Sequence, residues 1–217
     1  MIQSIPLLLQ AARMGRAFLI NLAFLPFVLV IGFIAGVTVA LVRYYRVPVL
    51  SQVLKAIVEL VRGAPFLLLV YATYFILPYL GLALDAFSSG VVVLSITSTA
   101  FLSEIFLSGF TSIDVGQYHA ADAMGMSFWG KMRFLIFPQV ARITLPSIVG
   151  QIVMIIKDTT IVSLVGLAEI VRTSRQISLL TLDPFTSFGI VAFYFFVICY
   201  PLIVVSKRLE RRLKRNA

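Results

Sequence analysis

The chain has 217 residues, of which 60% are hydrophobic and 12% are charged, and its mean hydropathy is +1.04. A soluble domain of this size needs far more charge on its surface, so the composition excludes that class and indicates one integral membrane domain. The net charge is +9, but many of the basic residues lie beside apolar segments. Basic residues there favour the cytoplasmic face of a membrane, and we expect no nucleic-acid partner.

Five apolar segments are long enough to cross a bilayer as helices, which takes about 20 residues. They are residues 17–42, 63–84, 86–108, 147–170 and 186–206. The sequence therefore predicts an all-α integral membrane domain over residues 1–217. Residues 2–12 are too short to span, and we expect them to lie in the outer membrane interface as a short amphipathic segment. The GxxxG spacing of Gly32 and Gly36 indicates ordinary close packing of helices.

The Lys and Arg residues predict the orientation of the chain. The C-terminal stretch KRLERRLKR holds six basic residues and is expected in the cytoplasm. Counting the spans back from it puts thirteen of the 18 basic residues on that side: these six with Arg43, Arg46, Lys55, Arg62, Lys131, Arg133 and Arg142. Four lie on the other side: Arg13, Arg16, Arg172 and Arg175. We therefore expect the N-terminus outside and the C-terminus in the cytoplasm.

A polar segment, residues 111–146, lies between the third and fourth predicted spans on the cytoplasmic side. Asp114 followed by Gln117 has the pattern of a capping box, in which the two side chains satisfy free N–H groups at a helix start. Gly125 is suited to end that helix in a left-handed conformation. The pattern predicts a short helix near residues 115–124.

A second short helix is predicted near residues 128–137, with Ser127 as its N-cap and Pro138 as its end. Two water-facing helices between membrane spans indicate a docking surface. The alternative is a cytoplasmic loop that packs on its own protein.

Four motifs follow one another along the chain: ELVRGAP at 59–65, the stretch 103–117, HAADAMG at 119–125 with LIFP nine residues later, and KDTTIVSLVGLAEI at 157–170. They resemble, in order, the ExxRGxP motif, the glutamate-to-GQ segment, the EAA motif and the KDTSL-type helix of one family. That family comprises the permease subunits of bacterial ABC importers for polar amino acids. The resemblance covers roughly residues 15–210.

The resemblance implies a type I ABC importer permease fold in the bacterial inner membrane. It implies that the EAA-like loop forms a coupling helix in a cleft of a separate ATPase subunit. The other implied partners are a second permease subunit (the same chain or a related one), an extracytoplasmic solute-binding protein, a polar amino acid and membrane lipid. ATP and Mg would be bound by the ATPase, and we expect no cofactor on this chain, which lacks a GxxxxGK[ST] motif.

The residues implied in coupling to the ATPase are Gly116, Gln117, His119, Ala120, Ala121, Asp122, Gly125 and Pro138. Those implied in a structural motif are Glu59, Arg62, Gly63 and Pro65, with Glu59 and Arg62 expected to pair on one helix. A coupling helix needs small residues, and Ala120, Ala121 and Ala123 are expected to leave one flank bare. Two positions depart from the family: His119 replaces its leading Glu, and Leu107 replaces an Arg that could pair with Glu104.

Ionisable residues inside predicted spans are candidates for a solute pathway, because each costs a few kcal/mol to place in a bilayer. On the fourth span Gln151 and Asp158 share one helix face, with Lys157 about 100° away. Acid, base and hydroxyl groups together suit an amino acid. The candidate pathway residues are Glu104, Gln151, Lys157, Asp158, Thr159 and Thr160. Structural ion pairs remain the alternative for Glu104 and Asp158.

Two other classes of function are possible from the sequence. An ion-gradient-driven secondary transporter is the main alternative, although the chain is small and lacks visible inverted repeats. An intramembrane enzyme would need its catalytic groups at one depth, whereas the single histidine, His119, lies in the cytoplasmic segment. One histidine and Cys199 in different regions cannot supply four metal ligands. We therefore expect a transport subunit, with no enzymatic activity and no metal site.

Overall fold

The computed structural model describes residues 6–216, and every regular element in that range is a helix. The α-helices are α1 (Leu7–Tyr44), α2 (Leu50–Gly63), α3 (Phe66–Tyr71), α4 (Ala86–Thr111), α5 (Val115–Ala123), α6 (Phe128–Lys131), α7 (Phe137–Asp158), α8 (Ile170–Thr181) and α9 (Pro184–Asn216). The π-helical turns η1 (Ala72–Ile76) and η3 (Met132–Ile136) and the 3-10 helices η2 (Leu77–Leu80) and η4 (Thr159–Val165) extend some of them. The all-α class predicted from composition is confirmed.

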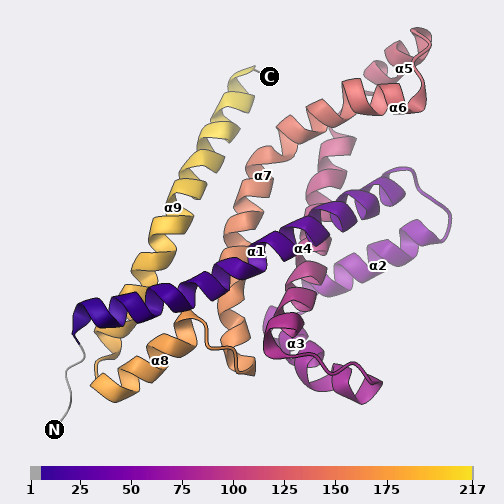
Figure 1. Cartoon of the computed structure of the whole chain (residues 1–217). Coiled ribbons are helices and arrows are strands. Elements are labelled where there is room, and N and C mark those ends of the chain that lie inside the picture. The colour runs from indigo at the N-terminus through magenta and orange to yellow at the C-terminus, as the bar shows by residue number, and fades with distance from the viewer. Residues whose placement is uncertain (1–5, 217) are drawn as a thin grey trace.

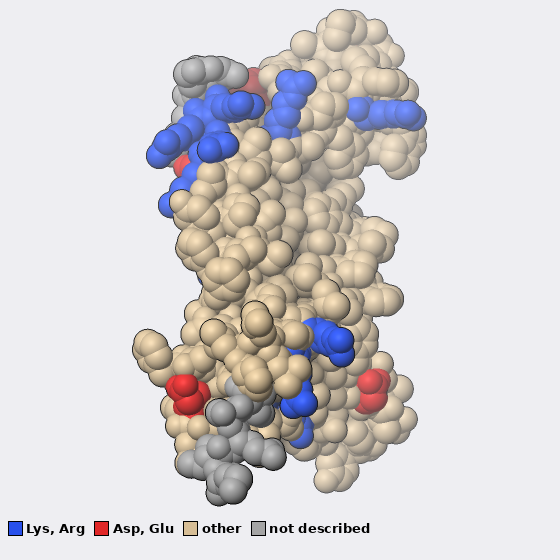
Figure 2. All heavy atoms as spheres, turned by 60° about the vertical axis from the view of Figure 1, so that its left-hand side comes forward, with Lys and Arg blue, Asp and Glu red and all other residues tan. Residues whose placement is uncertain are grey.

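Four of these helical runs are long and apolar enough to cross a membrane: Leu7–Tyr44, Ala86–Thr111, Phe128–Val165 and Pro184–Leu213. Three predicted spans, 17–42, 86–108 and 186–206, lie inside such runs. The fourth predicted span, 147–170, begins inside the run Phe128–Val165 but ends too late, because the helix stops at Val165. The charged residues are distributed as expected for a membrane protein. Figure 2 shows Lys and Arg near both ends of the visible face and an uncharged band between them.

The predicted span 63–84 differs most from the structure. Its apolar helical part, Phe66–Leu80, has 15 residues, too few to cross a bilayer unaided. Ala64 is extended (ψ 138°) because the residue before a proline avoids the helical conformation. At the other end Gly81 is left-handed (φ +83°) and stops the run. Helix α2 lies before the predicted span and shares only Gly63 with it.

The N-terminal segment also differs from the prediction. Residues 7–12 are not a separate interfacial segment but the first turns of α1, which is 38 residues long. Residues 2–5 of the predicted segment lie outside the described part of the chain. Continuous helix through Arg13 and Arg16 is possible because it keeps all backbone N–H groups paired, whatever the polarity of the side chains.

Pro138 does not end the second short helix, as the sequence predicted. The helix runs on through it into α7, because the chain adopts the π-helical turn η3 directly before the proline. A proline lacks the N–H that would bond back to the carbonyl four residues earlier, and a π turn changes the bonding pattern locally. Short helix and fourth span therefore form one run, Phe128–Val165.

Helices α1 and α4 make the most extensive contact in the molecule. Gly32 of α1 lies where a Cβ atom would be 2.5 Å from the Ser98 hydroxyl of α4. One turn on, a Cβ at Gly36 would be 3.0 Å from the Cβ of Leu102 and 3.3 Å from the Ser103 backbone nitrogen. The GxxxG pair thus packs α1 closely against α4, and a side chain at either position would separate the two helices.

The two ends of the molecule carry different elements (Figure 1). One end, called the α5 end below, holds α5, α6, η3 and the last turns of α9. The opposite end, called the α8 end, holds α8, η2, η4 and the start of α1. The first turns of α1 and the last turns of α9 therefore lie at opposite ends, consistent with an odd number of crossings.

Candidate functional site

Helix α5 is capped at both ends by residues next to it in sequence. The Asp114 carboxylate accepts a hydrogen bond of 2.6 Å from the Gly116 N–H. At the other end Gly125 has φ +70°, the Gly125 N–H donates to the Asp122 carbonyl, and the Met126 N–H donates to the Ala121 carbonyl. This is the Schellman arrangement, which satisfies the last carbonyl groups of a helix. The two caps predicted at Asp114 and Gly125 are confirmed.

The second half of the predicted capping box is wrong. The Gln117 side chain does not reach back to the helix start; its carbonyl oxygen accepts a hydrogen bond of 2.5 Å from the Gln139 side-chain amide. Gln139 lies on α7, and its amide also donates to the Leu135 carbonyl. Asp114 alone satisfies the start of α5, so Gln117 is free to tie α5 to α7.

One face of α5 packs on the rest of the protein. Tyr118 stacks on Tyr44 at the end of α1, with ring centroids 6.4 Å apart. Ala121 is fully buried, which corrects the prediction that all three alanines form a bare flank. Asp122 forms an ion pair with Lys131 of α6. Burial raises the pKa of the Tyr118 hydroxyl, so this ring stays neutral at physiological pH.

The opposite face of α5 and the neighbouring α6 are open to solvent. We call this the tip surface; its exposed residues are Val115, Gly116, His119, Ala120, Asp122, Ala123, Met124, Gly125, Phe128 and Trp129. Trp129 is 76% exposed and Met124 is 71% exposed. Large apolar side chains exposed together on a rigid, capped element are typical of a protein interface. Pro138, also predicted for coupling, is exposed on α7.

Glu104 lies in an ion cluster near the α5 end. Its carboxylate is 2.5 Å from an Nη atom of Arg43 on α1 and 3.7 Å from an Nη atom of Arg62 on α2. The Arg62 guanidinium also lies over the ring of Phe101, 5.4 Å from its centroid. Leu107 leaves no cation one turn along α4, but two other helices supply cations instead. The cluster fastens α1 and α2 to α4.

The structure corrects the predicted pair of Glu59 and Arg62. Glu59 pairs with Lys55 at 3.7 Å on the exposed side of α2, while Arg62 points to Glu104. Three residues along a helix turn the side chain by about 300°, and contact with α4 draws Arg62 to the other partner. Gly63 and Pro65 flank the break between α2 and α3.

The predicted pathway residues do not meet. Glu104 lies on α4 between Leu102 and Phe106, two members of the core cluster that also holds Met132 near the α5 end. Asp158 follows Ile155, which belongs to a different cluster around Phe24 at the other end of α7. Sequence periodicity gives the face of a helix on which a residue lies, but not which residues of two helices lie at the same depth.

The remaining pathway candidates lie on α7 and η4. Asp158 and Gln151 are half-buried and Lys157 is exposed. The Thr160 hydroxyl donates to the Lys157 carbonyl within its own helix. Thr159 is fully buried and belongs to a hydrogen-bond network, so it is not open to a solute in this structure.

That network joins three segments and was missed from the sequence. The Asn21 side-chain amide of α1 donates to the Thr159 hydroxyl and to the Glu169 carboxylate, both at 2.9 Å. Its carbonyl oxygen accepts from the Ile170 N–H at 3.2 Å. Glu169 is fully buried and also accepts from the Arg172 N–H at 2.8 Å, which caps α8. We call these residues (Asn21, Thr159 and Glu169) the buried network.

One signal in the sequence could have pointed to the buried network. Asn21 is an amide inside a long apolar span, where an unpaired polar group is costly. Asn21 is uncharged and lies in the first predicted span, so a charge inside the third or fourth span does not point to it. Its amide nevertheless makes three hydrogen-bonding contacts.

The comparisons with known proteins fit this architecture. The profile of the family described as the binding-protein-dependent transport system inner membrane component matches residues 29–215. The chain belongs to this family. It is therefore a multi-pass membrane component of a transport system, and the secondary-transporter alternative is not favoured.

Relatives with named substrates extend over nearly the whole chain. The probable glutamine ABC transporter permease protein GlnP of Bacillus subtilis is 34% identical over 204 residues, covering 93% of this chain and 94% of that protein. The arginine transport system permease protein ArtQ of the same organism is 31% identical, covering 86% of each.

Solved structures show the same fold. A chain from the crystal structure of an amino acid ABC transporter with histidines superposes with a TM-score of 0.82 and 28% identity, covering 97% of this chain and all of that one. An inward-facing MetNI methionine ABC transporter chain gives a TM-score of 0.76 at 17% identity, which supports the fold alone.

Proposed function

We propose that this protein is the membrane subunit of an ATP-driven importer that carries a polar amino acid across the bacterial inner membrane. The observation that carries the proposal is the tip surface, a rigid helix capped at both ends with exposed small and apolar residues. A separate ATPase subunit that binds ATP and Mg would dock there and change the conformation of the spans. The named substrates of the relatives, glutamine and arginine, support an amino acid as cargo.

The same proposal sets the orientation and the other partners. The α5 end faces the cytoplasm, and the α8 end faces the extracytoplasmic solute-binding protein. The basic residues support this, since Lys207, Arg208, Arg211 and Arg212 lie on the last turns of α9 at the α5 end. A second permease subunit completes the pathway, with Asp158, Lys157, Gln151 and Thr160 lining it.

The test is ATP-driven uptake by this protein in proteoliposomes, purified in complex with its cognate ATPase and supplied with its cognate solute-binding protein. A panel of radiolabelled amino acids is supplied with ATP, without ATP, and with a sodium or proton gradient alone. We expect uptake of at least one polar amino acid only with ATP. Uptake driven by the gradient alone, or of no amino acid at all, would contradict the proposal.

Asp158→Asn tests the pathway within that assay. We expect the uptake rate to fall about tenfold or more, because a solute ammonium loses its carboxylate partner. Asp85→Asn is the matched control: it removes an exposed carboxylate that caps α4, and asparagine caps equally well. Equal uptake by both variants at normal expression would remove Asp158 from the pathway.

A further inference from the structure

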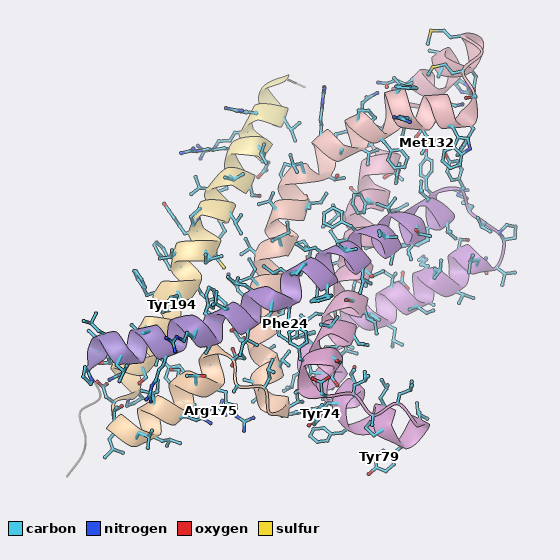
Figure 3. The ribbon with its side chains drawn as sticks, in the orientation of Figure 1. Phe24, Tyr74, Tyr79, Met132, Arg175 and Tyr194 are labelled. Carbon is cyan, nitrogen blue, oxygen red and sulfur yellow. The ribbon has the colours of Figure 1, made fainter. Side chains whose placement is uncertain are left out.

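A pocket of ≈ 470 Å³ opens at the α8 end, apart from the tip surface and the buried network. Its walls come from three segments: Tyr74 and Phe75 of η1, the stretch 163–166 at the end of η4, and the face of α8 that carries Arg172, Arg175 and Gln176. Figure 3 shows Arg175 and Tyr74 on the two sides of this opening. The volume is that of a small-molecule site.

The pocket wall carries two cations and no carboxylate. Arg172 and Arg175 both line it, whereas no Asp or Glu is among its lining residues. The ion pairs found in the described part of the chain involve other arginines and lysines, and the acid that acts on Arg175 from outside the pocket lining is the buried Glu169. Two guanidinium groups three residues apart on one helix lie on neighbouring positions of its surface. They attract an anion, and their planar fork of donors matches a carboxylate.

The arrangement of the pocket depends on neighbours that hold the arginines in place. The buried Glu169 carboxylate caps α8 through the Arg172 N–H, so the first turn of this helix is fixed. Gly166 is left-handed, with φ +103°, and a Cβ atom there would lie 3.1 Å from an Nη atom of Arg172. The missing side chain therefore leaves room for the guanidinium against the backbone.

Hydrogen-bond acceptors lie beside the arginines in the same pocket. Ser163 of η4 is a lining residue with a hydroxyl group, and Gln176 of α8 adds a side-chain amide. A hydroxyl or amide oxygen can accept a hydrogen bond from an ammonium group. The pocket therefore offers donors and acceptors to a molecule with a carboxylate beside an ammonium, and the aromatic rings of Tyr74 and Phe75 can contact its apolar part.

We infer that this pocket binds the α-carboxylate of the amino acid at the outer mouth of the transporter, with Arg172 and Arg175 as its ligands. The inference rests on the proposed function, because it takes the cargo to be an amino acid. This binding site is separate from the pathway site proposed at Asp158. Five residues of 3-10 helix between Asp158 and Ser163 span about 10 Å, whereas the carboxylate and ammonium of an amino acid are bonded to one carbon.

The test measures direct binding to the complex of permease and ATPase in lipid nanodiscs, without the solute-binding protein. The probe is the radiolabelled amino acid that the uptake panel identifies, and its primary carboxamide competes with it. We expect the wild-type complex to bind the amino acid at least tenfold more tightly than the carboxamide. Arg172→Gln with Arg175→Gln is expected to weaken amino-acid binding by at least tenfold and to abolish the preference over the carboxamide.

Two further variants make the result specific. Arg13→Gln removes an exposed cation of α1 at the same end but outside the pocket lining, and its affinity is expected to equal that of the wild type. Arg172→Lys with Arg175→Lys keeps both positive charges but removes the planar guanidinium donors. We therefore expect an affinity for the amino acid between those of the wild type and the glutamine variant. This pair also provides a test if the glutamine variant does not fold.

Several outcomes would overturn the inference while leaving the proposed function intact. In the first, the wild-type complex takes up the amino acid normally but does not bind it in the absence of the solute-binding protein. In the second, the wild-type complex binds the carboxamide as tightly as the amino acid. In the third, the arginine variants bind the amino acid with the affinity of the wild type. A fourth is loss of affinity for the binding protein alone, which would assign the pocket to a carboxylate of that protein. Failure of the uptake panel, in contrast, would contradict the proposed function itself.

Discussion

The two caps of α5 and the start of α6 are made by hydrogen bonds between residues at most five positions apart, whereas the buried network at the α8 end joins residues 138 to 149 positions apart. Asp114, Gly125 and Ser127 shape α5 and α6 from within the segment itself. Asn21, Thr159 and Glu169 hold three distant segments together. The first end can keep its shape while it moves relative to the spans; the second keeps its shape only while the spans stay packed.

This difference suits the two tasks proposed for the ends. A segment that transmits a conformational change from a separate subunit must be rigid by itself. Helix α5 contacts the spans through few side chains, among them Tyr118 and Gln117. A solute site must keep several groups in register, and the buried network fixes the helix that carries Arg172 and Arg175. The following changes break or sharpen the comparison, from the largest expected effect to the smallest.

Asn21→Leu removes the centre of the buried network at nearly constant volume. Three hydrogen-bond partners lose their contact, one of them a buried carboxylate, so we expect the protein to be less stable by about 2–3 kcal/mol. The midpoint of thermal unfolding of the purified complex measures this. Thr38→Val on the same helix is the control, because Thr38 is exposed and bonds only to its own helix. Equal midpoints for both variants would show that the network is not what holds the α8 end.

Gly125→Val forces a β-branched residue into a left-handed conformation, which costs about 1–2 kcal/mol locally. A Cβ atom at Gly125 would meet no neighbour within 4 Å, so the strain is in the backbone alone. We expect α5 to fray and the uptake per ATP hydrolysed to fall, while the unfolding midpoint of the spans changes little. Gly150→Ala, in a helical position that is equally open, is expected to lower neither quantity, because alanine is the better helix former. Intact coupling in Gly125→Val would refute the role of the tip surface.

Glu104→Gln tests whether the ion cluster is structural. Arg43 is only 9% exposed and would lose its carboxylate, so we expect stability to fall by about 1 kcal/mol after allowance for the 28% exposure of Glu104. Glu59→Gln breaks an ion pair in which both side chains are more than 60% exposed, and we expect no measurable change. Chemical or thermal unfolding of both variants decides between them. If Glu104→Gln kept its stability but lost uptake, Glu104 would belong to the solute pathway and not to a structural ion pair.

His119→Glu restores the acid found at this place in the resembled family. His119 is exposed on the tip surface, so stability is expected to stay within about 0.5 kcal/mol. Uptake per ATP hydrolysed should be preserved or improved. A clear loss of coupling, measured in the same proteoliposome assay, would show that the ATPase partner has adapted to the histidine.

The short helix α5 could be predicted because its caps are local. An N-cap carboxylate accepts a hydrogen bond from an N–H group two residues ahead, and a left-handed glycine ends the helix that it follows. Asp114 and Gly125 therefore predict the two ends of α5 wherever the segment lies in the fold. The partner of Gln117 could not be predicted in this way. Its side chain could bond either to the N–H group at the start of α5 or to Gln139, and only the packing of α5 against α7 favours Gln139. The same limit applies to Pro138, where the sequence shows the missing N–H but not the π turn that accommodates it.

By itself the sequence determined the all-α membrane class and the motifs that point to an importer subunit, because apolar length and local capping act within a few turns of chain. Tertiary structure alone decided that Glu104 meets Arg43 and Arg62, and that Asn21 joins Glu169. It also brought Arg172, Arg175 and Gly166 around one pocket. These contacts depend on the relative depth and rotation of helices, which packing sets and which no periodicity along a single helix records.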